Sequence, residues 1–291
     1  MASFTIPDVY VDQFSANVYQ LSRQRMSRLR RTVTRMEELT GESKRLDRSD
    51  VVDDTPNEVT ERYGQMPLNL INYDSRWLFP KNYDFATLVD TFDKAKLLLD
   101  PQSTSTREHA GTMGRKMDDT IIAALGGNAY SGTSGSTAVP LPAAQEIATG
   151  SVGLTTSKLI TAKEILSESD VDPDQPYYLI YNPRQLSDML EDPKIQSSDF
   201  NMVKALVEGT ISRWMGFEWI LSNRLTLTST TRFLYAYTAS ALVWGDHIPV
   251  QSRTDLRPDL RGVPYQAYTW GGWDVTRMED TQVVEIACTE N

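Results

Sequence analysis

The sequence predicts an α+β fold, with helices in the middle of the chain and strands concentrated towards its end. Two middle segments, at 101–125 and 156–167, place apolar residues three or four positions apart, which is typical of one helical face. From residue 216 onward, short runs of β-branched and aromatic residues are typical of strands. Hydrophobic residues make up 40% of the 291, enough for a sizeable core.

The composition excludes several classes of protein. The 39 acidic and 29 basic residues give a net charge of −10, which argues against a protein that coats nucleic acid with its whole surface. Only two histidines occur, His109 and His247, so histidine-based catalysis and histidine metal sites are disfavoured. The single cysteine, Cys288, cannot form an intramolecular disulfide, and we expect it inside a strand in a reducing compartment. We therefore expect no catalytic residue, cofactor or metal.

Membrane insertion is also not expected. No run approaches the roughly 20 apolar residues that a membrane-spanning helix needs. The first residues, Met-Ala-Ser-Phe-Thr-Ile-Pro, have neither the basic nor the apolar region of a secretory signal.

Residues 14–39 predict an amphipathic helix, since their apolar positions are mostly three or four apart. No acid lies between Asp12 and Glu37, so this arm is basic within an acidic protein. Its polar face contains six arginines: Arg23, Arg25, Arg28, Arg30, Arg31 and Arg35. Two interpretations stay open, a face that is solvated or paired with acids of a neighbouring subunit, and a face that contacts nucleic acid or an acidic assembly partner.

Residues 47–80 predict a long two-stranded excursion that projects from the body. The segment is rich in charged residues, Thr and Asn and has no core-sized apolar cluster. Because an isolated hairpin is marginally stable in water, we expect a neighbour to cover it. Residues 83–99 then lead back to the body.

A long helix is predicted from Asp100-Pro101, where Asp caps and Pro begins the first turn, to a stop at Gly126-Gly127. About 25 residues at 1.5 Å each give a length of roughly 38 Å, enough to span a domain. Its inward face should contain Ala110, Met113, Met117, Ile121 and Ala124.

Residues 126–153 are rich in Gly, Ser, Thr and Ala and predict a flexible loop. Gly150–Lys158 lacks the Gly-Lys-Ser/Thr step of a phosphate-binding loop, so we reject a nucleotide site. Asp170–Asp174 lacks the glycine and the bidentate glutamate of a calcium loop, having Gln175 and Tyr181 there, and predicts a solvated turn.

The remaining elements are shorter. A second helix is predicted at Thr156–Ser167, a buried strand at Tyr177–Tyr181, and helices from Asn182-Pro183 to Glu191 and from Asp199 towards Arg213. The later strands are predicted at 216–221, 232–237, 241–244, 265–270 and 282–287.

The order of these elements resembles the HK97-type fold that tailed-phage major capsid proteins share with encapsulins. Several stretches are similar to a podovirus-like capsid family: Asp100–Ser103 and Arg115–Gly126 to its spine-helix region, Tyr178–Leu186 and Gly209–Ser222 to its axial lobe, and Arg277–Ile286 to its last strand. The resemblance extends from about residue 45 to the end. It implies an N-terminal arm at 1–46, an extended loop at 47–85, a peripheral domain at 86–168 and 262–291, and an axial domain at 169–261.

The same resemblance implies a structural function without enzymatic activity. Copies would assemble in the cytoplasm of a host bacterium, through pentamers and hexamers, into an icosahedral virion head around double-stranded DNA. A scaffolding protein, a portal and a decoration protein are the further partners it implies. The six arginines would contact scaffold or DNA on the inner surface, and Arg62, Tyr63, Arg76 and Trp77 would contact an adjacent subunit. For Trp77, packing within its own subunit stays open as an alternative.

Some members of this group cleave a long N-terminal segment or cross-link their shells through lysine–asparagine bonds. This sequence departs from both patterns: its arm is short, and no lysine lies between Lys44 and Lys81. We therefore predict a shell held by non-covalent contacts.

Three alternative functions would each fit part of the sequence. An encapsulin-like compartment shares the fold and differs in cargo. A soluble carboxylate-dependent hydrolase would draw on Asp118, Asp119, Asp170, Asp172 and Asp174, but adjacent aspartates diverge on a helix and the others lack a partner. A carbohydrate-binding or tail-fibre protein fits the tryptophans but not the long helix or the basic arm.

Overall fold

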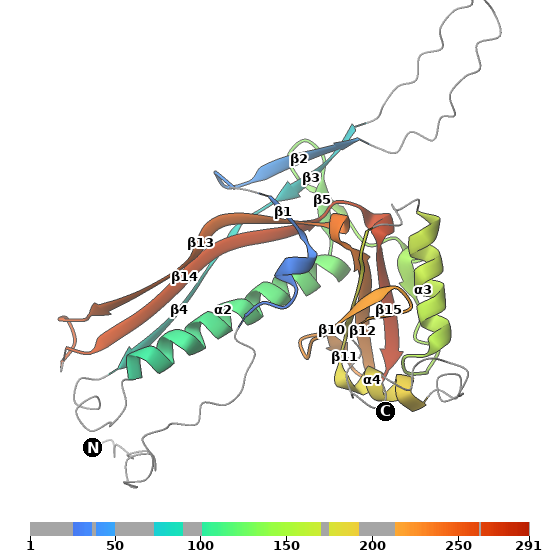
Figure 1. Cartoon of the computed structure of the whole chain (residues 1–291). Helices are drawn as coiled ribbons and strands as arrows, with labels where there is room; N and C mark the ends of the chain where they lie inside the picture. The colour runs from blue at the N-terminus through green and yellow to red at the C-terminus, as the bar shows by residue number, and fades with distance from the viewer. Residues whose placement is uncertain are drawn as a thin grey trace, which may run out of the picture.

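The computed structural model describes residues 26–36, 39–49, 73–89, 101–169, 175–191, 213–261 and 263–290, with side chains in the long helix from residue 107. The fold is α+β, as predicted. Figure 1 shows a long, narrow sheet with one long helix running beside it, a compact lobe at one end of that sheet, and a hairpin that rises from the region between them.

The long sheet has the strand order β1-β13-β14-β4. Its bounds are β1 Thr34–Met36, β13 Leu242–Leu256, β14 Tyr265–Arg277 and β4 Lys81–Val89. β13 and β14 pair in antiparallel fashion along their whole length, with irregularities between Asp246 and Gln251. The predicted strands at 241–244 and 265–270 exist but are much longer, because the exposed distal parts of both strands contain polar residues that hide their strand character.

The long helix α2, Pro101–Gly126, confirms the predicted helix and packs along the long sheet. Met113, Met117 and Ile121 are buried as expected. Ala110 is exposed instead, and the buried face also includes Ile122 and Leu125 near the C-terminal end, so the face differs slightly from the predicted one. Trp273 of β14 donates from Nε1 to Thr120 Oγ1 over 3.2 Å, which joins the C-terminal part of the helix to the sheet.

The lobe is built on a second sheet with the order β7-β15-β12-β8-β10-β9, and β11 pairs with β12. Its bounds are β7 Glu146–Ile147, β8 Tyr177–Tyr181, β9 Arg213–Trp214, β10 Phe217–Leu221, β11 Leu227–Thr228, β12 Thr231–Thr238 and β15 Val283–Thr289. The helices α3, Thr156–Glu168, and α4, Pro183–Glu191, lie beside it (Figure 1) and confirm two predicted helices. The helix predicted from Asp199 lies outside the described residues.

The chain passes twice from one sheet to the other. Between β12 and β13 the link is a 3₁₀ turn at Ala239–Ala241, and between β14 and β15 it is a second at Asp280–Gln282. The predicted domain boundaries do not follow the sheets, because β13 lies in the long sheet while α3 and β15 belong to the lobe. The boundaries themselves stay a prediction.

The rising hairpin is formed by β2, Lys44–Ser49, and β3, Tyr73–Leu78, which pair in antiparallel register. This pairing confirms the predicted two-stranded excursion at its base; residues 50–72 lie outside the described residues. A small apolar cluster of Leu39, Leu46 and Leu78 packs beneath it.

The prediction of a flexible loop at 126–153 is wrong. The segment contains a small hairpin of β5, Ala129–Ser131, and β6, Thr137–Val139, followed by a 3₁₀ turn and β7. Gly132 and Gly135, both with positive φ, form the turn between β5 and β6. The abundance of Gly and Ser reflects this tight turn, and it masked two short strands.

The helix predicted at 14–39 is wrong for the residues that the structure describes. Residues 30–32 form a single 3₁₀ turn, and β1 pairs in parallel with β13 through Thr34, Arg35 and Met36. The four-residue spacing of Leu29 and Val33 suits a helix, and both residues do reach the core. The β-branched run from Thr32 to Thr34 instead favours the extended backbone that pairing with β13 requires.

This N-terminal segment lies directly against α2. Asp118, fully buried, accepts a hydrogen bond from Ser27 Oγ at 2.6 Å and from the backbone N–H groups of Arg28 and Leu29 at 3.1 and 3.2 Å. One turn earlier, a Cβ at Gly114 would lie 2.8 Å from Ser27 N, so only glycine permits this approach. Together these two positions fix the path of the segment across the helix.

A second buried polar contact lies near the distal end of α2. His109, 1% exposed, places Nε2 2.9 Å from Thr87 Oγ1 on β4 and Nδ1 3.2 Å from Thr269 Oγ1 on β14. Because the Thr269 hydroxyl donates to Ser252, it must accept from Nδ1–H, which leaves Nε2 as the acceptor from Thr87. The neutral ring therefore joins helix to sheet, and burial lowers the pKa of His109.

Asp118→Asn should lower the free energy of unfolding of the unassembled subunit by about 1–3 kcal/mol, the range for losing charged hydrogen bonds. Trypsin should then cut faster after Arg28, Arg30 and Arg31, which mass spectrometry would detect. The control is Asp119→Asn, which removes a partly exposed carboxylate paired with Arg224. Equal effects of the two changes would contradict the role given to Asp118.

Stability should fall as the pH drops below about 6.5, the ordinary histidine value, because the unfolded chain takes up a proton that folded His109 resists. The loss should continue until the pH passes the lowered pKa of the folded state. Urea unfolding at several pH values would show His109→Gln to be less pH-dependent than the unchanged protein. If His247→Gln removed the dependence instead, the assignment to His109 would be wrong.

Candidate assembly surfaces

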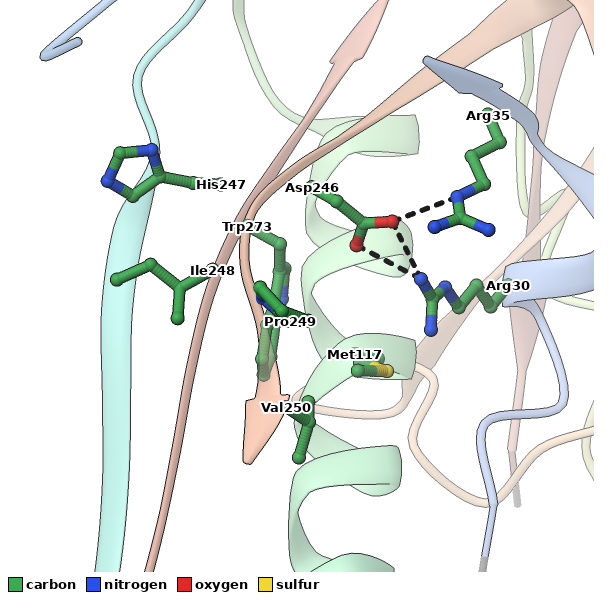
Figure 2. Close-up of a pocket in the computed structure, with 9 residues that line it drawn as sticks. All are labelled: Arg30, Arg35, Met117, Asp246, His247, Ile248, Pro249, Val250 and Trp273. Atoms are coloured by element: carbon green, nitrogen blue, oxygen red, sulfur yellow. Dashed lines mark hydrogen bonds and ion pairs between the residues drawn. The ribbon is translucent and has the colours of Figure 1, made fainter. Parts of the chain in front are cut away.

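The arginines of the N-terminal segment pair with acids of their own chain. Arg30 donates from Nη2 to both oxygens of Asp246, at 3.0 and 2.8 Å, and Arg35 donates from Nε to Asp246 Oδ2 at 2.9 Å, as Figure 2 shows. Trp244 donates to the same carboxylate at 2.7 Å, and the Arg30 guanidinium lies 5.3 Å from its ring centre. The Asp246 carboxylate of β13 therefore pairs with both Arg30 and Arg35.

The other two described arginines reach the lobe. Arg31 donates to Glu218 Oε1 at 2.6 Å, and Arg28 donates from Nη1 to the backbone oxygen of Leu221 at 2.7 Å. The side chains of Arg31 and Arg35 remain 66% and 65% exposed. Pairing with acids of the same chain was not among the predicted interpretations; Arg23 and Arg25 lie outside the described residues.

The arginines border a groove between the N-terminal segment, α2 and β13. Two hollows of about 760 and 470 Å³ adjoin here and share Arg30, Arg35, Met117 and Val250 in their walls. Figure 2 shows Met117 on α2 beside Val250 of β13, with the two arginines opposite. We call this hollow the arginine groove.

Of the four residues predicted to contact an adjacent subunit, only Arg76 and Trp77 lie in the described part of the chain. Arg76 is only 2% exposed and donates to Asp74 at 2.6 Å and to Asp280 at 2.9 Å, so its side chain has almost no surface left for a neighbour. Trp77 is partly buried, donates to Gly132 O at 2.6 Å and stacks on Phe79. Arg62 and Tyr63 lie outside the described residues.

Arg76 belongs to a network of three arginines and three carboxylates at the base of the hairpin. Arg48 donates to Glu279 at 2.9 Å and lies 3.5 Å from Asp74, while Arg277 pairs with Asp280. The fully buried Arg277 also donates to the backbone oxygens of Leu125, Gly127 and Val139. The charges balance, and the network joins hairpin, helix end and sheet junction.

The groups weighed for catalysis have structural roles in the described part of the chain. Asp118 holds the N-terminal segment, and Asp119 pairs with Arg224. Asp170, Asp172 and Asp174 are not described. Burial raises the pKa of Cys288 to about 12, so it is a thiol rather than a nucleophilic thiolate.

Lys158, weighed above as a phosphate ligand, is buried in the lobe. Its ammonium donates to the backbone oxygens of Thr149, Val152 and Ala287 at 2.8–3.1 Å. It thereby joins α3 to the preceding loop and to β15.

The described residues contain neither a candidate metal site nor a helix suited to crossing a membrane. They contain no group of three or more His, Cys, Asp and Glu side chains placed to hold a metal ion. Among the helices that the structure describes, none has both the length and the apolar character needed to cross a membrane.

Comparison with solved structures finds phage capsids. The chain is similar to the capsid of cyanophage P-SCSP1u, with 12% identity and a TM-score of 0.75 over 98% of this chain and 94% of that one. The capsid of Ralstonia phage GP4 gives 10% identity and a TM-score of 0.74 over 100% and 98%. A Mycobacterium phage Che8 structure gives 18% identity and a TM-score of 0.60 over 85% of each chain.

The sequence comparisons give one family. No curated protein matches the chain. The model of the phage capsid protein family matches residues 6–290, nearly the whole sequence. The mixed α+β fold and the shell structures it resembles agree with that match. The chain belongs to the phage capsid protein family and is a structural component of the virion rather than an enzyme.

Proposed function

We propose that the chain is the major capsid protein of a tailed phage, and that its copies assemble through pentamers and hexamers into an icosahedral head around double-stranded DNA. The family match over residues 6–290 is the observation on which this depends. Assembly would take place in the cytoplasm of the host bacterium. The match favours a phage head over an encapsulin-like compartment.

The architecture supports a division of the subunit into the parts of an HK97-type fold. The segment around β1 would be the end of the N-terminal arm, and β2–β3 the base of the extended loop. The long sheet with α2 as its spine would form the peripheral domain, and the lobe around β8, β10 and β12 the axial domain. Portal and decoration proteins would be further partners of the finished shell.

The distal part of the long sheet needs a cover that the single subunit lacks. Every residue from Val250 to Leu256 is exposed. Exposed apolar side chains gather on the distal part of this sheet and the turn that joins its two long strands: Phe85, Leu88, Val250, Leu256, Leu260 and Val263. Because burial of a leucine stabilises by about 1.5–3 kcal/mol, contacts with neighbouring copies would recover this free energy.

The edges of the long sheet lead to the same conclusion. β1 pairs only with Val243–Gly245 of β13, and β4 forms the opposite edge of the sheet in the described structure. Edge strands present backbone N–H and C=O groups that bind a further strand or require protection. A shell in which each subunit touches several others sums such contacts into a stable particle.

Negative-stain electron microscopy of the purified protein, with light scattering alongside, should show closed shells, tubes or rings of five and six subunits. The double change Leu88→Glu and Leu256→Glu should leave the subunit folded, because both side chains are more than half exposed, yet reduce assembly severalfold. Circular dichroism of the variant controls for folding. A uniform monomer or dimer under every condition would contradict the proposal.

Subunits from assembled particles should run as monomers on a denaturing gel after full reduction. No amine is available between Lys44 and Lys81, so residues 45–80 contain no lysine for an isopeptide bond to a neighbour. A ladder of covalent oligomers would show this expectation to be wrong. Mass spectrometry of any higher band would then identify the linked residues.

A further inference from the structure

Two side-chain oxygen atoms of α4 are buried without a hydrogen-bond partner in the part of the chain that the structure describes. They are Oε1 of Gln185 and Oδ2 of Asp188. Gln185 is fully buried, and its Nε2 donates to Glu290 Oε1 at 2.8 Å, so the side-chain oxygen is the atom left unsatisfied. A buried acceptor without a donor costs stability, so we expect a donor to serve these two oxygens.

The two residues are neighbours on the helix surface. Side chains three positions apart on an α-helix lie beside each other, with their Cβ atoms about 5–6 Å apart. Glu290, which accepts from Gln185, is also close enough to Asp188 for its charge to act on that carboxyl. Both side chains therefore lie near the end of β15, and one hydrogen between Oδ2 and Oε1 would satisfy both oxygens.

The Asp188 carboxyl lies directly against the loop that precedes α3. A Cβ at Gly153 would lie 2.3 Å from Oδ2, so only glycine permits this approach. The backbone N–H of Leu154 donates to the carboxyl, and because Oδ2 has no partner the accepting oxygen is Oδ1. Burial raises the pKa of Asp188, although the Leu154 N–H lowers it.

The charged surroundings of Asp188 do not supply the missing donor. The titratable groups that act on it are Arg184 and Glu191 of α4, Lys158 of α3, Cys288 of β15, and Glu290 just after β15. The Lys158 ammonium uses its three N–H bonds on backbone oxygens. Arg184 is half exposed, and its Nε lies 3.9 Å from Oδ1, beyond hydrogen-bond distance.

We propose that Asp188 binds a proton in the folded lobe and donates it from Oδ2 to Oε1 of Gln185, so that α4 is held more firmly as the pH falls. The proton comes from solvent, and Oδ1 keeps its bond from Leu154. The protonated carboxyl would join α4 to the loop before α3 and, through Gln185, to the end of β15. Loss of the proton would leave a negative charge beside an unpartnered oxygen, which is unfavourable in a buried place.

The dependence on pH has a defined sign. Because the pKa of Asp188 is raised above its ordinary value of 3.8 in the folded state, the stabilisation is complete below that value. It is lost as the pH rises through the raised pKa of the folded state. His109 acts in the opposite direction, since burial lowers its pKa, so variants of the two residues separate the two effects.

Asp188→Asn tests the proposal in the unassembled full-length subunit, because the asparagine amide supplies an N–H donor at every pH and carries no charge. At about pH 9 its thermal midpoint should exceed that of the unchanged protein by about 2–4 °C, the size expected for one buried unsatisfied group. The gain should shrink as the pH is lowered. Asp119→Asn is the matched control, since it removes a carboxylate that is paired with Arg224, and it should give no such gain.

Infrared difference spectroscopy gives a direct measurement of the proton. The unchanged protein should show the C=O band of a protonated carboxyl above the ordinary aspartate pKa, and Asp188→Asn should lack it. Gln185→Leu removes the proposed acceptor and should lower the pH at which the band disappears. A loss of stability in Asp188→Asn at about pH 9, or a band that Asp188→Asn leaves unchanged, would overturn the proposal, because Asp188 would then be an ordinary ionised carboxylate.

Discussion

The buried side chain of Arg277 is the contact on which the relative placement of helix, hairpins and sheets depends. An isolated charge in a protein interior is strongly unfavourable, so a buried guanidinium needs a carboxylate and hydrogen-bond acceptors close to it. Here Nε donates to Asp280, and the two terminal nitrogens donate to the backbone oxygens of Leu125, Gly127 and Val139. Two of these oxygens lie at the C-terminal end of α2, which no further helical N–H can satisfy.

Asp280 extends this contact outward. Its second oxygen accepts from Arg76 of β3, and Arg76 in turn binds Asp74. A continuous chain of charged hydrogen bonds therefore passes from the end of the long helix, through the turn where the backbone changes sheets, to the base of the projecting hairpin. Loss of Asp280 would leave the almost fully buried Arg76 and Arg277 without the carboxylate they share, so the network favours one geometry.

The sequence was enough to predict the three helices α2, α3 and α4 and several of the strands. Periodic apolar residues and the Asp100-Pro101 and Asn182-Pro183 starts identified α2, α3 and α4, and aromatic and β-branched runs identified four strands of the lobe, β8, β10, β12 and β15, but not the two-residue strands β7, β9 and β11. The segment after Met26 was predicted wrongly because four-residue spacing suits a helix equally well. Its strand exists only because β13, more than 200 residues later, offers an edge.

The ion pairs at the candidate surfaces could not be predicted from the sequence, because a charged residue does not indicate which residue it pairs with. The basic character of the N-terminal segment was clear, yet Glu218 and Asp246, which pair with it, lie 187 to 216 residues further along the chain. Arg76 was expected at an interface for the same reason: arginine is common there, and nothing local indicates that Asp280 buries it. Only tertiary structure brings these pairs together.

Burial divides the arginines of this protein into two groups with different functions. Removing one partner of a buried pair costs about 3–5 kcal/mol, whereas an exposed pair is worth about 0–1 kcal/mol. Arg76 and Arg277, at 2% and 0% exposed, therefore cannot exchange partners without disturbing the fold. Arg31 and Arg35, at 66% and 65%, can. The buried group can therefore hold the hairpin in one orientation, whereas the exposed group leaves charged side chains at the surface of the subunit.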